Sequence, residues 1–316
     1  EPRPILVARA RSRDEKFQDC IDAAQNSSTS PYRVPAGHLT AVITFPDLDL
    51  FGMPGRGSFL PASVGLAGMA HETGHGMDLV HSFSDDPTYR NAPWAQIGEY
   101  DDPWDMMSYA NVFSRKADPF GYGGPGMNSY HLDRMGWLPR SRILTLGADG
   151  VGRRTVTLAA LTHAEAAGFL HVRIPFDPAD LFHYYTVEFR RNDGWDTGIP
   201  NDVVLIHEVK PDPDGVYHAY LLRARDATKA PIQSLDKNGA TITVDTVSAA
   251  TNQATVTVSS SITSRCLQGY VWREANASDH VCVTTSRLRC VAFPAAEMRA
   301  CPGSCGARPP PPITCA

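Results

Sequence analysis

The stretch His71-Glu72-Thr73-Gly74-His75-Gly76-Met77-Asp78-Leu79-Val80-His81 places three imidazoles and one carboxylate close together in the chain. An α-helix advances about 100° per residue, so His71 and His75 project from the same face, one turn apart. Two neutral imidazoles in this arrangement can bind one metal ion. The spacing therefore predicts a helix that carries two ligands of a zinc site.

A third imidazole follows in the same stretch. One straight helix cannot bring His81 to the metal held by His71 and His75, so we expect the helix to end near Met77 or Asp78 and the chain to turn back. Three protein ligands leave the fourth tetrahedral position open for water, which is typical of a catalytic zinc site. Glu72 lies beside the first ligand, where it can serve such a water as general base.

This run resembles the signature of the metzincin metallopeptidases, HExxHxxGxxH followed by a Met-turn. Asp78 stands where that family has glycine, and aspartate is among the few other residues enriched in the left-handed backbone conformation expected there. The segment Asp105-Met106-Met107-Ser108-Tyr109 is similar to the family's Met-turn. The resemblance implies that Met107 forms the hydrophobic floor below the zinc, and that Tyr109 contacts the metal or stabilises the reaction intermediate. Ordinary core positions are the alternative for both side chains.

Four further segments extend the resemblance: Gly98-Glu99-Tyr100-Asp101-Asp102-Pro103-Trp104-Asp105, Asn128-Ser129-Tyr130-His131-Leu132-Asp133-Arg134-Met135-Gly136-Trp137-Leu138, Tyr184-Tyr185-Thr186-Val187-Glu188-Phe189-Arg190-Arg191 and Gly194-Trp195-Asp196-Thr197-Gly198-Ile199-Pro200. They resemble segments of the secreted peptidases related to immune inhibitor A and gametolysin, and the similarity covers about residues 38–210. It implies a zinc-dependent endopeptidase that is secreted and acts on protein or peptide substrates.

Composition limits the class of protein. A chain of 316 residues can form two domains with separate cores. Its net charge of −5, without a basic cluster, argues against a nucleic-acid partner. No apolar run approaches the roughly 18 residues of a membrane span, so no spanning helix is expected. We also expect the protein to be a monomer. The start at Glu1-Pro2, without Met or signal peptide, predicts a processed or trimmed form.

The cysteines are unevenly distributed, with one near the start and six at the end. Cys20 is predicted to be a buried free thiol, or to have lost a partner upstream of Glu1. The crowded end predicts a disulfide-stapled tail, which also favours secretion; a structural zinc is the alternative. The six are Cys266, Cys282, Cys290, Cys301, Cys305 and Cys315.

We expect an α+β protein with three regions: a metzincin-like zinc catalytic domain at 1–140, a β-sandwich domain at 141–260 and a short disulfide-rich tail at 261–316. Helical patterns cover residues 14–24, the zinc helix opened by 61–63, and 127–137. Alternation predicts a strand at 37–45, and a Gly-rich loop is expected at 52–57. Seven short β-rich runs suggest the sandwich: 143–146, 155–161, 169–174, 184–190, 203–209, 240–247 and 254–259.

Two features of the expected catalytic domain have alternative interpretations. By the resemblance, residues 38–46 form the strand that lines the cleft and pairs with extended substrate; an internal strand is the alternative. The segment between His81 and Met107 is rich in acidic residues, which predicts a solvated loop or, through hard oxygen ligands, a Ca²⁺ site. The acidic residues are Asp85, Asp86, Glu99, Asp101 and Asp102.

Two other functions compete with this interpretation. In a thermolysin-like site, Glu99 rather than His81 would be the third ligand. In a non-catalytic adhesion or carbohydrate-binding protein, the metal site would be degenerate, for which Asp78 is the one hint in the sequence. The remaining histidines lack ligand spacing and are expected at surface or hydrogen-bonded core positions: His38, His131, His163, His171, His183, His207, His218 and His280.

Overall fold

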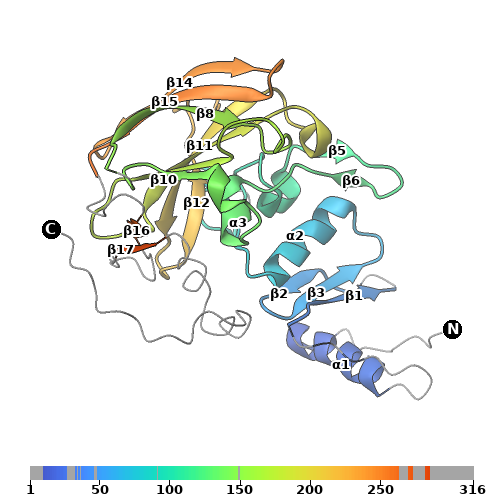
Figure 1. Ribbon diagram of the computed structural model, residues 1–316. Helices are drawn as coiled ribbons and strands as arrows, with labels where there is room; N and C mark the ends of the chain where they lie inside the picture. Colours follow the sequence, from blue (N-terminus) through green and yellow to red (C-terminus); the bar gives the residue numbers. More distant parts are fainter. Residues whose placement is uncertain are drawn as a thin grey trace.

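The computed structural model describes residues 10–26, 33, 35, 37–45, 48–90, 92–148, 150–262, 270–272 and 282–284. The protein is mixed α+β, with several β-sheets and few helices (Figure 1). Nearly all of the expected tail lies outside the described residues, as do its cysteine side chains and therefore the expected disulfides. Two short strands within it pair antiparallel, β16 (Tyr270–Trp272) and β17 (Cys282–Thr284).

The first helix, α1 (Arg13–Gln25), confirms the helical pattern at 14–24. Ser12 caps it in a capping box with Glu15, which satisfies backbone N–H groups that the first turn leaves without partners. Its apolar side packs Phe17 and Cys20 against aromatic residues of the first sheet. Cys20 is a buried free thiol, as expected.

A three-stranded sheet follows, in the order β1-β3-β2. Here β1 (Thr40–Thr44) confirms the strand expected within 37–45 and pairs parallel with β3 (Gly57–Pro61). The expectation of a Gly-rich loop at 52–57 is wrong, because β2 (Phe51–Met53) pairs antiparallel with β3 and leaves a short turn between them. Both β2 and β3 contact α2 (Leu66–Gly76), the helix of the histidine motif.

Two larger sheets lie in the remaining chain (Figure 1). Each of the seven expected β-rich runs contains most of a strand. The six-stranded sheet has the order β4-β12-β11-β10-β9-β7, and the four-stranded sheet has the order β13-β14-β15-β8. The strands that confirm the expectation are β7 (Ile143–Thr145), β8 (Arg153–Ala159), β9 (His171–Pro175), β10 (Tyr184–Arg190), β11 (Val203–Pro211), β14 (Ala240–Ser248) and β15 (Gln253–Ser260).

Both faces of the middle of the six-stranded sheet are buried. Along β10, Val187 and Phe189 enter a core shared with β14 and β15 of the four-stranded sheet. The alternate residues Glu188 and Arg190 are also buried, on the opposite face. There Ser129, at the start of α3 (Ser129–Arg134), donates its N–H to Glu188. One face of this sheet therefore supplies a hydrophobic core, while the other supplies buried charge.

The six-stranded sheet also includes a strand from the first part of the chain. β4 (Phe83–Ser84) begins two residues after His81 and pairs parallel with β12 (Tyr217–Leu221). The expected boundary at residue 140 therefore runs through one sheet, and His81 lies where the chain leaves α2 for that sheet. The remaining short elements are β5 (Arg115–Lys116), β6 (Tyr122–Gly123), β13 (Ser234–Lys237) and the 3₁₀ turns η1 (Met106–Asn111), η2 (Arg140–Arg142) and η3 (Gly194–Asp196).

Candidate metal centre

The helix α2 begins later than the sequence predicts and ends where it predicts. Pro61, expected to open it, is the last residue of β3, and Gly65 is the residue that precedes the first turn. The helix ends at its C-cap, Met77. His71 and His75 therefore lie one turn apart on the second half of a short helix.

The turn after α2 is made by Asp78, which has φ 63°. This is the left-handed conformation expected where the metzincin pattern has glycine, and the aspartate adopts it. The Leu79 N–H donates to the Gly74 carbonyl at 3.0 Å, so the chain reverses tightly around the end of the helix. The reversal directs the next residues back toward His75.

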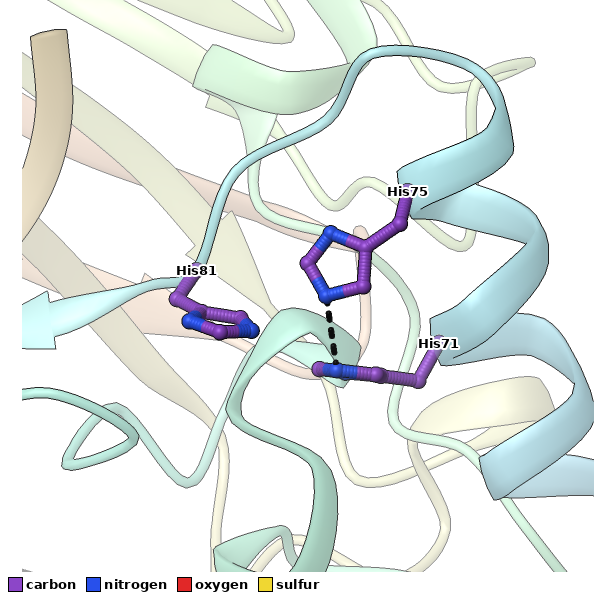
Figure 2. A group of neighbouring side chains, drawn as sticks. All are labelled: His71, His75 and His81. Atoms are coloured by element: carbon purple, nitrogen blue, oxygen red, sulfur yellow. Dashed lines mark hydrogen bonds between the residues drawn. The ribbon is translucent and has the colours of Figure 1, made fainter. Parts of the chain in front are cut away.

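Three imidazoles meet as a result (Figure 2). His71 and His75 approach from α2, and His81 approaches from the segment that enters β4. The Nε2 atoms of His71 and His75 are 3.0 Å apart, and the ligand atoms of all three residues lie within 4.8 Å of one another. Within the described ranges, this is the one group of three or more His, Cys, Asp or Glu side chains placed to hold a metal ion.

Each imidazole is also hydrogen-bonded through its outer nitrogen. His71 Nδ1 lies 3.1 Å from the carbonyl oxygen of Met106, and His75 Nδ1 lies 2.9 Å from that of Leu79. His81 Nδ1 lies 2.6 Å from Glu99 Oε1. An Nδ1–H that donates to these acceptors leaves each Nε2 lone pair directed into the group.

Electrostatics keep two of the three rings neutral, as metal ligation requires. Burial, together with the neighbouring imidazoles, lowers the pKa of His71 to about 3 and the pKa of His75 to about 4. Burial also raises the pKa of Glu72 to about 7, although a hydrogen bond from the Gly52 backbone opposes that shift. The group thus combines neutral donors with a buried carboxyl that titrates near neutrality.

These observations fit a zinc ion. Zn–N bonds of 2.0–2.1 Å at a tetrahedral centre place ligand nitrogens about 3.3 Å apart, close to the 3.0 Å between His71 and His75. Three nitrogen donors with outer hydrogen bonds match the donor set of catalytic zinc sites.

Glu99 is not in the group: its Oε1 accepts from His81 and its Oε2 accepts from the Gln96 N–H at 2.8 Å. The thermolysin-like arrangement is therefore not the one observed.

Met107 and Tyr109 both lie beside the group, in η1. Met107 is fully buried below α2, and a Cβ added at Gly74 would lie 2.6 Å from its sulfur. Tyr109 is 36% exposed, and its ring centroid is 5.1 Å from that of His71. Its backbone has φ 46°, a strained value for a residue with a bulky side chain. The structure thus brings both residues of the predicted Met-turn to the histidines.

Sequence reasoning missed two neighbours of the group. Tyr100 is buried, with its ring centroid 4.2 Å from that of His81, and burial followed by the charges of Glu99 and Glu72 raises its pKa. Tyr100 was visible only as part of a family-like segment, which gave no hint that it would contact His81. The other neighbour is β2.

The strand beside Glu72 is β2, which the sequence assigned to a loop. A Cβ at Gly52 would lie 2.2 Å from the carbonyl oxygen of Glu72 and 2.4 Å from the Cβ of His75. Only glycine permits this approach, which the Gly-rich composition of the segment could have signalled. β1 (Thr40–Thr44), which lies within the stretch expected to line the cleft, is at the opposite edge of the same sheet from β2.

The acidic segment between His81 and Met107 is not a solvated loop, and its carboxylates do not converge on a shared metal site. Asp86, Asp101 and Asp102 are buried, contrary to the expectation of an exposed loop. Each acidic residue has a separate partner, so within the described part of the chain they form no second metal cluster. The pairs are Asp85 with Arg225 at 2.7 Å, Asp86 with Lys229 at 2.8 Å, Glu99 with His81 at 2.6 Å, Asp101 with Arg223 at 2.7 Å and Asp102 with His207 at 2.9 Å.

The other described histidines lie outside the metal group, as expected. His131, His171 and His207 are fully buried in polar surroundings. Others pair with acidic residues: His163 with Asp193, His183 with Glu208 and His218 with Asp212. His280 lies outside the described residues.

Comparison of the chain with protein-family models, with curated protein sequences and with solved structures gave no match. Among the described residues, no helix is both long enough and apolar enough to cross a membrane. The site must therefore be interpreted from its own geometry.

Proposed function

We propose that this protein is a secreted zinc endopeptidase of the metzincin type, related to the immune inhibitor A and gametolysin peptidases. The observation that carries the proposal is the convergence of three tethered imidazoles around one point, with Glu72 in the next helical position after His71. A structural site would close the fourth position with another protein ligand. No fourth His, Cys, Asp or Glu joins the group among the described residues, which favours a catalytic role.

In this proposal His71, His75 and His81 hold the ion. Zinc bound in this way lowers the pKa of a water molecule and polarises the scissile carbonyl. The Glu72 carboxylate accepts a proton from the attacking water and returns it to the nitrogen of the leaving amine. Burial raises the pKa of Glu72, and a raised pKa makes its carboxylate a stronger base toward the water.

Other residues position the reaction. Tyr109 lies beside His71 and is partly exposed, which supports its assigned role. In this proposal its hydroxyl donates to the carbonyl oxygen of the substrate as negative charge develops there. Met107 supports the group from below, where its sulfur packs against Gly74. The Gly52 N–H fixes the carboxylate of Glu72.

The finer architecture belongs to the same proposal. Residues 1–140 supply the catalytic region, residues 141–260 supply every strand but β4 of a β-sandwich domain, and residues 261–316 form a disulfide-rich tail. The shared core of the two larger sheets supports the second assignment, since it places two layers face to face. The six clustered cysteines support the third assignment and secretion.

The proposal predicts that Glu72→Ala retains about one zinc per chain yet loses about 10²- to 10⁴-fold in kcat/KM on casein or a quenched peptide. Chelation should abolish hydrolysis by the unaltered protein, and added zinc should restore it. Glu165→Ala, which alters a largely exposed carboxylate, is the matched control and should leave both measurements unchanged. Turnover by Glu72→Ala near that of the unaltered protein would exclude this mechanism.

A further inference from the structure

Glu99 differs from the other two hydrogen-bond acceptors around the histidine group. His71 and His75 face neutral backbone carbonyls, whereas His81 faces a carboxylate at 2.6 Å. Both side chains are largely shielded from solvent, with 22% of His81 and 13% of Glu99 exposed. A charge-assisted hydrogen bond in such surroundings is stronger than a neutral one.

The Glu99 carboxylate is itself fixed in place. Its second oxygen, Oε2, accepts the Gln96 N–H at 2.8 Å, while Oε1 faces His81. Both oxygens are thus engaged in defined directions. Glu99 can hold its partner without a further loss of side-chain freedom when the partner binds metal.

The backbone that carries Glu99 is anchored to the segment that carries His81. Glu99 forms an antiparallel bridge with Phe83, and the Tyr100 N–H donates to the Ser82 carbonyl at 3.0 Å. Gly98, with φ 82°, allows this pairing, because a Cβ there would lie 2.3 Å from the Ser84 carbonyl oxygen. The pairing of these two segments therefore fixes the position of the Glu99 carboxylate relative to the His81 imidazole.

This arrangement is what His81 needs as the ligand least constrained by the helix. His71 and His75 share α2, so their relative placement follows from helical geometry. His81 comes from an irregular segment beyond a left-handed turn, so its ring orientation depends on contacts to the side chain. An acceptor at Nδ1 keeps the proton on that nitrogen and directs the Nε2 lone pair toward the other two histidines.

We propose that Glu99 is a positioning residue that sets the metal affinity of the group: its carboxylate, fixed by the Gln96 N–H, orients His81 through Nδ1 without itself contacting the ion. The proposal rests on the proposed zinc site. Outer hydrogen-bond partners of this kind contribute about 10- to 100-fold to metal affinity. The same loss is therefore expected when the carboxylate is removed.

The test is the zinc dissociation constant of the full chain, measured by competition with a chromophoric chelator. Glu99→Ala should bind zinc about 10- to 100-fold more weakly, and Glu99→Gln, which keeps an acceptor without the charge, should lose less. His81→Ala should lose more than either variant. Glu165→Gln is the matched control, because Glu165 also accepts from a histidine Nδ1, that of His163 at 2.8 Å, outside the metal group.

Thermal unfolding of the metal-free variants separates this role from a structural one, and the near-isosteric Glu99→Gln keeps the test valid if Glu99→Ala does not fold. Unchanged zinc affinity in the Glu99 variants would overturn the inference while leaving the zinc site intact. A loss in Glu99→Ala as complete as that in His81→Ala would also overturn it, because Glu99 would then behave as a direct ligand. Failure of the unaltered chain to bind zinc would instead refute the proposed function.

Discussion

Two sets of histidines in this molecule make similar hydrogen bonds but differ in their arrangement. The converging set is His71, His75 and His81, and the buried set is His131, His171 and His207. His81 places Nδ1 2.6 Å from Glu99, and His131 places Nδ1 2.8 Å from Asp105. The Nε2 atom of His131 has no hydrogen-bond partner among the described residues. The ring nitrogen that His81 directs inward lies within 4.8 Å of the ligand nitrogens of His71 and His75. His131 belongs to no group of possible metal ligands among the described residues.

The buried set serves the six-stranded sheet instead. His207, on β11, lies 2.9 Å from Asp102, and His171, on β9, lies 2.6 Å from the hydroxyl of Ser129. These contacts join the sheet to the segments that carry Asp102 and α3. A hydrogen bond to one ring nitrogen therefore does not by itself make a histidine a metal ligand. A metal site also requires the free lone pairs of several imidazoles to point toward one position.

Removal of one imidazole from the metal group should have the largest effect. His75→Ala should abolish stoichiometric zinc binding and reduce peptide hydrolysis to background, because two imidazoles do not complete the three-ligand site. Metal analysis after dialysis measures the effect. His163→Ala, which removes an acid-paired histidine outside the group, serves as control. Full zinc occupancy in His75→Ala would contradict the assignment of the converging histidines as the metal ligands.

Removal of a residue from the buried set should affect folding instead. His207→Ala leaves Asp102 fully buried without its partner, and should lower the free energy of unfolding by about 3–5 kcal/mol. Urea denaturation measures the loss. Zinc stoichiometry of the folded fraction should remain near that of the unaltered chain; its disappearance would mean that the buried set also contributes to the metal site.

The His207 contribution should depend on pH. Burial lowers the pKa of His207, but the hydrogen bond and charge of Asp102 outweigh this and raise the pKa above 6.5. Stabilisation by the charged imidazole is therefore full below pH 6.5, the unfolded value, and is lost as pH rises through the folded pKa. The difference in unfolding free energy between the unaltered chain and His207→Ala should be larger at pH 6 than at pH 9. A difference that grows toward pH 9 would contradict this assignment.

The smallest expected effect concerns the turn that places His81 in the converging set. Asp78→Gly removes the strain of a left-handed aspartate but adds freedom to the unfolded chain, so unfolding free energy should change by less than about 1 kcal/mol. Asp78→Val, with a β-branched side chain at φ 63°, should destabilise more and weaken zinc binding. Equal stability of the glycine and valine variants would indicate that the turn does not require this conformation.

Local patterns predicted much of the fold. The alternation of apolar residues located β1 and seven strands of the two larger sheets, since a strand with a buried face reveals its period of two. The helical pattern at 14–24 located α1, and the six-residue step from His75 to His81 located the end of α2. The short strands β4, β12 and β13 carried too weak a pattern, and β2 was hidden by its glycine.

The acidic segment shows where such patterns fail. Its composition is that of a solvated loop, yet Asp86, Asp101 and Asp102 are buried. Their partners Lys229, Arg223 and His207 lie more than one hundred residues further along the chain. Buried charge is tolerated only when it is paired, and no local pattern reports a partner that distant.

The helical spacing of His71 and His75 and the left-handed turn at Asp78 could be predicted from the sequence, because each depends on residues within a few positions of one another. The tertiary structure alone decided that Glu99 lies behind His81, that Tyr100 packs beside it, and that β2 contacts Glu72. These contacts depend on how separate segments pair, which is set by sheet register and burial rather than by local spacing.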